Sequence, residues 1–161
     1  MSNAQENNPE TVWKIVKKVG VAMLVTHKND EFEGRPLQGF PEPEAGRILF
    51  MTDSQHVIDQ VNANSGVMLS FANTGGNDWA AIDGDARVTN DRAKIKELWT
   101  PWAEAFWDSP EDPSIRIIEV TPHRARYWDA PNRIATMIAM LAGAVTGKAP
   151  ELGKSGDVQL N

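Results

Sequence analysis

The sequence predicts a mainly β fold with helices, in which six or seven antiparallel strands close into a barrel. Most of the short apolar segments are separated only by turn-forming residues, which is typical of strands joined as hairpins. One helix is expected between the third and fourth strands, whereas a doubly wound parallel sheet needs a helix between nearly every pair. No linker interrupts the 161 residues, so we expect one domain over residues 9–147, with polar, flexible ends at 1–8 and 148–161.

The first expected element is a helix that begins at Asn8. Asparagine is a good N-cap, and the proline and glutamate that follow it suit the first helical turn. Apolar residues then recur at helical spacing as far as Val19, and Gly20 supplies the end.

The next three elements are expected to be strands, at residues 21–26, 35–40 and 47–52. The polar residues 28–34 indicate a turn between the first two strands. Residues 41–46 contain two prolines and a glycine, which separate the second strand from the third.

The remaining strands are expected at residues 67–73, 79–89, 115–121 and 124–128. Gly84 lies within the longest of them and marks a bulge or a bend. Pro122 and His123 separate the last two strands, because proline cannot donate to the ladder of a central strand.

Three more helices are expected. One covers residues 55–62 after a cap at Asp53 or Ser54. Another starts at Asn90 and Asp91, and Pro101 should kink or restart it. Its apolar side comprises Ile95, Leu98, Trp99 and Trp102. The last covers about residues 134–145, and a polar tail is expected from Gly147 onward.

The composition excludes several classes of function. A net charge of −6 without a basic block argues against binding to nucleic acid or to an anionic membrane. The chain has no cysteine, so disulfides, thiol nucleophiles and Cys-ligated zinc are excluded. Its three histidines have no partner at metal-ligand spacing, so no metal site is expected. We find no secretion signal and no membrane span, and we expect a cytoplasmic protein.

The clearest candidate site is the junction between the third strand and the helix after it, over residues 50–57. A helix N-terminus exposes unpaired N–H groups and suits a phosphate. Thr52 and Ser54 add hydroxyl groups, and His56 adds a titratable cation. The plainer interpretation is an ordinary N-cap followed by an exposed histidine. Arg35, which opens a strand before Pro36, is a second and weaker candidate for binding a phosphate.

Segments in this order resemble the pyridoxamine 5'-phosphate oxidase-like proteins, an FMN-binding split-barrel superfamily, and within it the general stress protein 26 branch. The resemblance extends from about Thr11 to Trp128. It is carried by these motifs: Arg35-Pro36-Leu37, Phe50-Met51-Thr52, Ser54-Gln55-His56-Val57, Asp85-Ala86-Arg87-Val88 with Asp91, Leu98-Trp99 with Trp102, Asp112-Pro113, and Tyr127-Trp128-Asp129.

The resemblance implies a homodimer of split barrels with FMN at each subunit interface. Less expected alternatives are the deazaflavin F420 and haem, which some relatives bind. Arg35 and the turn from Ser54 through Gln55 to His56 would hold the flavin phosphate. Four further residues would lie along the rest of the cofactor, namely Pro36, Leu37, Met51 and Thr52. A tryptophan of the partner subunit, either Trp99 or Trp107, would close the pocket.

One position departs from the family pattern, because His56 stands where the family usually has lysine. Lysine is a permanent cation at neutral pH, whereas histidine titrates near pH 6.5, so we expect weaker cofactor binding or a preference for another ligand. Three functions stay open. They are a flavin-dependent oxidoreductase of unknown substrate, a non-catalytic flavin-binding or flavin-sensing stress protein, and an interaction dimer without cofactor.

Overall fold

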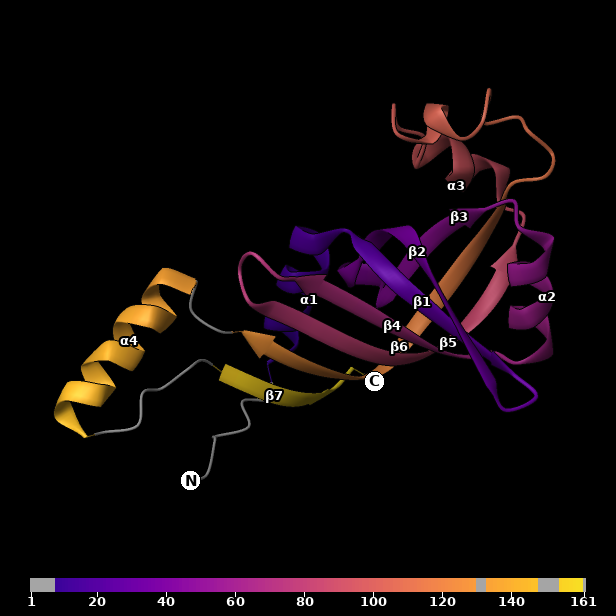
Figure 1. The fold of residues 1–161 in the computed structure, drawn as a ribbon. Helices are drawn as coiled ribbons and strands as arrows, with labels where there is room; N and C mark the ends of the chain where they lie inside the picture. Colours follow the sequence, from indigo (N-terminus) through magenta and orange to yellow (C-terminus); the bar gives the residue numbers. More distant parts are fainter. Residues whose placement is uncertain (1–7, 130–132, 148–153, 161) are drawn as a thin grey trace.

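The computed structural model describes residues 8–129, 133–147 and 154–160, and its centre is one seven-stranded antiparallel sheet in the order β3-β2-β1-β4-β5-β6-β7. An additional pairing of β3 with β6 closes the first six strands into the expected barrel (Figure 1). The strands are β1 (Val21–Lys28), β2 (Glu31–Glu42), β3 (Arg47–Thr52), β4 (Gly66–Asn73), β5 (Asp78–Thr89), β6 (Arg116–Asp129) and β7 (Lys154–Gln159).

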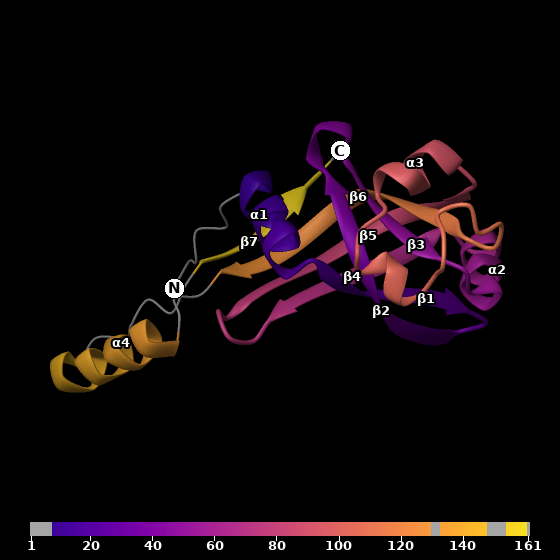
Figure 2. The same ribbon diagram turned by 90° about the horizontal axis from the view of Figure 1, so that it is seen from above.

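The helices α1 (Pro9–Val19) and α2 (Gln55–Ala63) lie toward opposite ends of the barrel (Figures 1 and 2). Both begin as the sequence predicts. The Asn8 side chain accepts a hydrogen bond from the Thr11 N–H, and the Ser54 side chain accepts one from the Val57 N–H. Gly20 ends α1 with φ 75°, a conformation that suits glycine.

The hairpin between β1 and β2 is tighter than expected. The predicted turn over residues 28–34 shrinks to Asn29 and Asp30, whose φ angles are 52° and 63°. Positive φ at both central residues is the backbone of a tight hairpin turn, and Asn and Asp tolerate it well. Consequently β2 begins at Glu31, and Glu33 and Arg35 become neighbours on one face of the same strand.

The two strands expected at 115–121 and 124–128 are one strand, β6. It continues through Pro122 and His123 because β5 and β6 shift register between Asp83 and Gly84, where a bulge accommodates the extra residue. A Cβ on Gly84 would lie 2.6 Å from the Thr121 carbonyl oxygen, so the close approach of the two backbones requires glycine.

The expectation of a polar tail after Gly147 is wrong over residues 154–159, which form β7 along the edge of β6. Only Val158 signals a strand, and its side chain is fully buried in the main core. One buried apolar residue among polar neighbours is too weak a period-2 pattern to predict a strand. Residues 148–153 lie outside the described part, so the boundary of the domain stays a prediction.

Buried side chains form two clusters. The main core fills the barrel and includes Leu24, Phe50, Leu69, Phe71 and Tyr127. The second cluster contains alternate residues of β3, together with side chains from the segment between β5 and β6 and from the start of β6. Its buried members are Leu49, Met51, Ile95, Ala103, Trp107, Ile115 and Ile117. Both faces of β3 are therefore buried as far as its last residue, Thr52.

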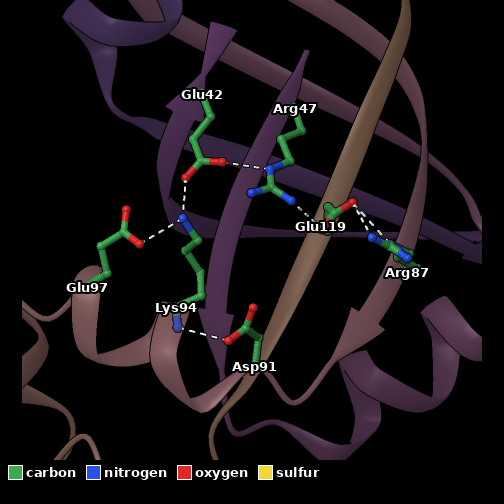
Figure 3. A network of polar contacts seen from close by, with 7 residues as sticks. All are labelled: Glu42, Arg47, Arg87, Asp91, Lys94, Glu97 and Glu119. Carbon is green, nitrogen blue, oxygen red and sulfur yellow. Dashed lines mark hydrogen bonds and ion pairs between the residues drawn. The ribbon is translucent and has the colours of Figure 1, made fainter. Parts of the chain in front are cut away.

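The helix predicted from Asn90 is shorter than expected. It is α3 (Arg92–Glu97), and Trp99 and Trp102 lie beyond it, before the 3₁₀ turn η2 (Ala103–Ala105). Figure 3 shows how charges tie α3 to the barrel. Lys94 of α3 donates to Glu42, and Arg47 joins Glu42 to Glu119. The hydrogen bond from Lys94 is the main reason that the pKa of Glu42 lies below its ordinary value.

The predicted final helix is present as α4 (Arg133–Thr146), and it stands apart from the barrel in both views (Figures 1 and 2). Its large apolar side chains are exposed, at Met137, Ile138, Met140, Leu141 and Val145. No helix among the described residues is long and apolar enough to cross a membrane.

Candidate functional site

Arg35 is the centre of the candidate site. It lies on β2 opposite Leu24, and its side chain is only 18% exposed. One guanidinium nitrogen, Nη2, donates to Gln60 Oε1 at 2.9 Å and to Glu33 Oε2 at 3.0 Å. The other nitrogen, Nη1, is buried and has no hydrogen-bond partner among the described residues. A buried cationic donor without a partner is costly, so Nη1 is a candidate to donate to a bound group.

Gln60 positions the guanidinium from α2. Its side-chain oxygen also accepts a hydrogen bond of 2.8 Å from the Thr26 hydroxyl, and both Gln60 and Thr26 are buried. This contact joins α2 to β1 at the same Gln60 oxygen that accepts from Arg35. A buried amide that serves two donors fixes the direction in which Arg35 points.

The N-terminal turn of α2 provides the second part of the site. The Thr52 hydroxyl accepts a hydrogen bond from the Ser54 N–H at 3.1 Å, so the last residue of β3 orients the cap of the helix. His56 Nε2 lies 2.8 Å from Glu33 Oε2. Because a carboxylate only accepts, His56 donates this bond, which is the main reason that the pKa of Glu33 lies below its ordinary value.

The structure thus links Arg35 and His56, two of the residues predicted from sequence, through Glu33. Thr52 and Ser54 belong to the same turn, whereas the Gln55 side chain is directed to Asp59 at 2.7 Å. Sequence reasoning missed Glu33, Gln60 and Thr26. The available signal was the two-residue spacing of Glu33 and Arg35, which becomes meaningful only once β2 is known to include both.

The other predicted residues lie elsewhere in the subunit. Pro36 is exposed on the outside of the barrel, and Leu37 is partly buried against the main core. Met51 belongs to the second cluster together with Trp99 and Trp107. The two tryptophan rings are 6.4 Å apart and tilted by 44°, and the buried Trp107 Nε1 has no partner among the described residues. Their predicted role toward a partner subunit is untested.

An open groove of about 470 Å³ lies on the outside of β1, β4 and β5. Apolar side chains line it at Val25, Phe32, Val67 and Met68, and polar ones at His27, Asn64, Asp83 and His123. The rings of His27 and Phe32 are 5.2 Å apart. Asn64, directly after α2, contacts His27, so the groove and the Arg35 site flank the same helix. In the described ranges no three His, Asp or Glu side chains gather as metal ligands would.

A family model decides what kind of protein this is. The model described as pyridoxamine 5'-phosphate oxidase like matches residues 7–151, nearly the whole chain. The chain belongs to this family. Solved structures with the same fold include proteins named general stress protein 26, in agreement with the branch that the sequence resembles.

Among curated relatives, protein bli-3 of Neurospora crassa is 27% identical over 118 residues. The match covers 66% of this chain but 56% of that protein, so the chain spans little more than half the length of this curated relative. The general stress FMN/FAD-binding protein of Xanthomonas citri is 25% identical, with a TM-score of 0.66. Its match covers 74% of this chain and 87% of that one.

A protein of Jannaschia sp. CCS1 named as general stress protein 26 has a TM-score of 0.79 at 20% identity. Here the match covers 93% of this chain and 96% of that chain. Residues 1–129, which end with β6, are about four fifths of the 161 residues. Because the match covers a larger share of the chain than this, it extends past β6. The match to this structure therefore includes part of the segment that contains α4 and β7.

Proposed function

We propose that this chain binds FMN, with the flavin phosphate held by Arg35 and by the turn from Ser54 to His56. The observation that carries the proposal is the buried Nη1 of Arg35, which has no partner among the described residues. Glu33 links the same guanidinium to His56 in the first turn of α2. Arginine binds phosphate oxygens through two parallel N–H groups. The donors that are present fit a phosphate.

The other residues that the family resemblance assigns to the cofactor have less support from the structure than Arg35 has. Pro36 is exposed beside Arg35, and Thr52 is fixed by the hydrogen bond that it accepts from Ser54. Met51, Trp99 and Trp107 are packed in the second cluster, and would contact a cofactor only at the edge of that cluster. The X. citri structure, whose description names FMN and FAD, supports a flavin over F420 or haem.

A flavin, when bound, supplies hydride and electron transfer, while the protein supplies binding, orientation and access. We propose a flavin-dependent oxidoreductase whose substrate and electron donor are unknown. The proposal needs no acidic or basic side chain. A non-catalytic flavin-binding or flavin-sensing stress protein is the second candidate, and the description of the X. citri structure as a general stress FMN/FAD-binding protein supports it.

We also propose that the protein is a homodimer with its cofactor at the subunit interface. The outer face of β1 and β4 supports this, because large apolar side chains are exposed there, namely Val21 (42%), Met23 (44%) and Met68 (37%). Met23 lies opposite Ser70, and Val25 lies opposite Met68, so the exposed side chains form one continuous surface. Contiguous apolar surface of this kind is typical of interfaces.

A visible-range spectrum of the purified protein tests the cofactor. Flavin absorption, with FMN identified in the material released by denaturation, supports the proposal. A haem spectrum, or release of F420, contradicts it. Turnover of NADH or NADPH with generic electron acceptors then separates an oxidoreductase from a non-catalytic flavin-binding protein.

A further inference from the structure

Glu33 occupies the space between the two cationic groups of the candidate site. Its Oε2 lies 3.0 Å from Arg35 Nη2 and 2.8 Å from His56 Nε2, so one oxygen serves both side chains. Glu33 and Arg35 are two residues apart on β2, so their side chains lie on the same face of the strand. His56 lies on α2. The carboxylate joins strand to helix at the point assigned to the phosphate.

The negative charge of Glu33 disfavours the binding of a phosphate beside it. Its lowered pKa keeps the carboxylate ionised at neutral pH. Arginine contributes one permanent positive charge, which Glu33 balances. While His56 is neutral, the three side chains together carry no net positive charge. A phosphate that enters beside Glu33 therefore meets repulsion as well as the attraction of Arg35.

The Glu33 carboxylate accepts hydrogen bonds from only some of the donors of the site. It leaves Arg35 Nη1 without a partner among the described residues, whereas the terminal oxygens of a phosphate monoester can serve several donors at once. The Glu33 side chain is 43% exposed, so it can rotate into solvent without crossing the core. Displacement of Glu33 by phosphate is therefore sterically feasible.

We propose that Glu33 is a built-in counter-anion that the phosphate of the ligand must displace, and that it limits how strongly this site distinguishes a phosphorylated flavin from an unphosphorylated one. This inference rests on the proposed function, because it assigns the phosphate of FMN to Arg35 and His56. It makes Glu33 a determinant of ligand selectivity.

The test compares the wild type with Glu33→Gln, which keeps the shape and removes the charge, for FMN and for riboflavin. We expect FMN affinity to rise about 3- to 10-fold, as removal of one partly exposed charge allows. Riboflavin has no phosphate, so its affinity should stay the same. Glu31→Gln is the matched control, since Glu31 is an exposed residue at the start of the same strand, and it should change neither affinity.

Inorganic phosphate provides a second readout that needs no flavin. Added phosphate should raise the melting temperature of Glu33→Gln more than that of the wild type or Glu31→Gln. If this difference appears but no protein binds FMN, the counter-anion role stands and the proposed function fails. If the wild type binds FMN and Glu33→Gln binds it equally or more weakly, the inference is wrong. If neither the wild type nor Glu33→Gln binds FMN or phosphate, both are wrong.

Discussion

At the scale of single residues, His56 makes FMN binding depend on pH. Protonated His56 attracts a phosphate and neutral His56 does not, so affinity should fall as pH rises through the range in which histidine loses its proton. The lysine of the His56→Lys variant stays positively charged over this pH range, so the variant should show a smaller fall in affinity. Fluorescence titrations of both proteins between about pH 5.5 and 8 measure it. The phosphate of FMN titrates in the same range, so the difference between the two proteins is the informative quantity.

Identical pH profiles for wild type and His56→Lys would show that His56 does not face the phosphate. Glu33 then remains as its only partner in the described structure.

Asp78 should make folding stability depend on pH. Its side chain is 6% exposed at the start of β5. Burial raises the pKa of Asp78, but hydrogen bonds from Lys18 and Asn73 outweigh it, so the pKa lies below its ordinary value of 3.8. The unfolded chain then binds more protons than the folded one, and stability falls as pH drops below about 4.

Asp78→Asn removes this contribution. We expect it to lower the free energy of unfolding by about 1–3 kcal/mol at pH 7, as for a hydrogen bond to a charged group, and by less near pH 3. Urea unfolding at the two pH values measures the difference. An equal loss at both pH values would contradict the assigned ion pair with Lys18.

Individual residues were predicted well where the signal is local. Asn8, Gly20 and Ser54 cap their helices as expected, because a cap depends on neighbours three or four residues away. Glu33 and Gln60 were missed, because their contacts cross from β2 to α2, 25 residues apart for Gln60 and Arg35. Such contacts follow from the register of the sheet, which no single segment encodes.

At the scale of elements, a bulge at His123, opposite Asp83 and Gly84 of β5, allows β6 to remain one strand. Gly84→Ala should lower the free energy of unfolding by roughly 1–3 kcal/mol, because the new Cβ would meet the Thr121 carbonyl oxygen at 2.6 Å. Chemical denaturation measures this loss. Gly75→Ala is the matched control, since its nearest neighbour would be a side-chain atom at 3.6 Å. Equal stabilities would show that the backbones are not so close.

Strands with alternating or continuous apolar residues were predicted to within a few residues, as for β3, which matches in full. The misjudged elements are those that depend on partners distant in sequence. β6 joins two predicted strands because it accommodates His123 as a bulge opposite Asp83 and Gly84 of β5. β7 is a strand because it pairs with the edge of β6. Trp99 and Trp102 lie beyond the end of α3: Trp99 packs against the cluster that covers β3, whereas Trp102 is exposed.

At the scale of the whole molecule, the apolar outer face of β1 and β4 should hold two subunits together. Met68→Lys places a charge in this surface and should shift the protein from dimer toward monomer, since a desolvated unpaired charge is costly. Sedimentation velocity or light scattering measures the mass. Asn62→Lys adds the same charge on the exposed side of α2 and should leave the dimer intact.

A Met68→Lys protein with unchanged mass would place the interface elsewhere. The exposed apolar side chains of α4 would then be the next surface to test.

The central claim is that Arg35 holds the phosphate of a flavin, and an FMN titration of wild type and Arg35→Ala tests it most directly. Loss of one charge-assisted contact should weaken binding about 10- to 100-fold. Arg87→Ala, in which the lost side chain is 69% exposed, should bind FMN as the wild type does. Equal affinity of Arg35→Ala and wild type would contradict the proposed phosphate site.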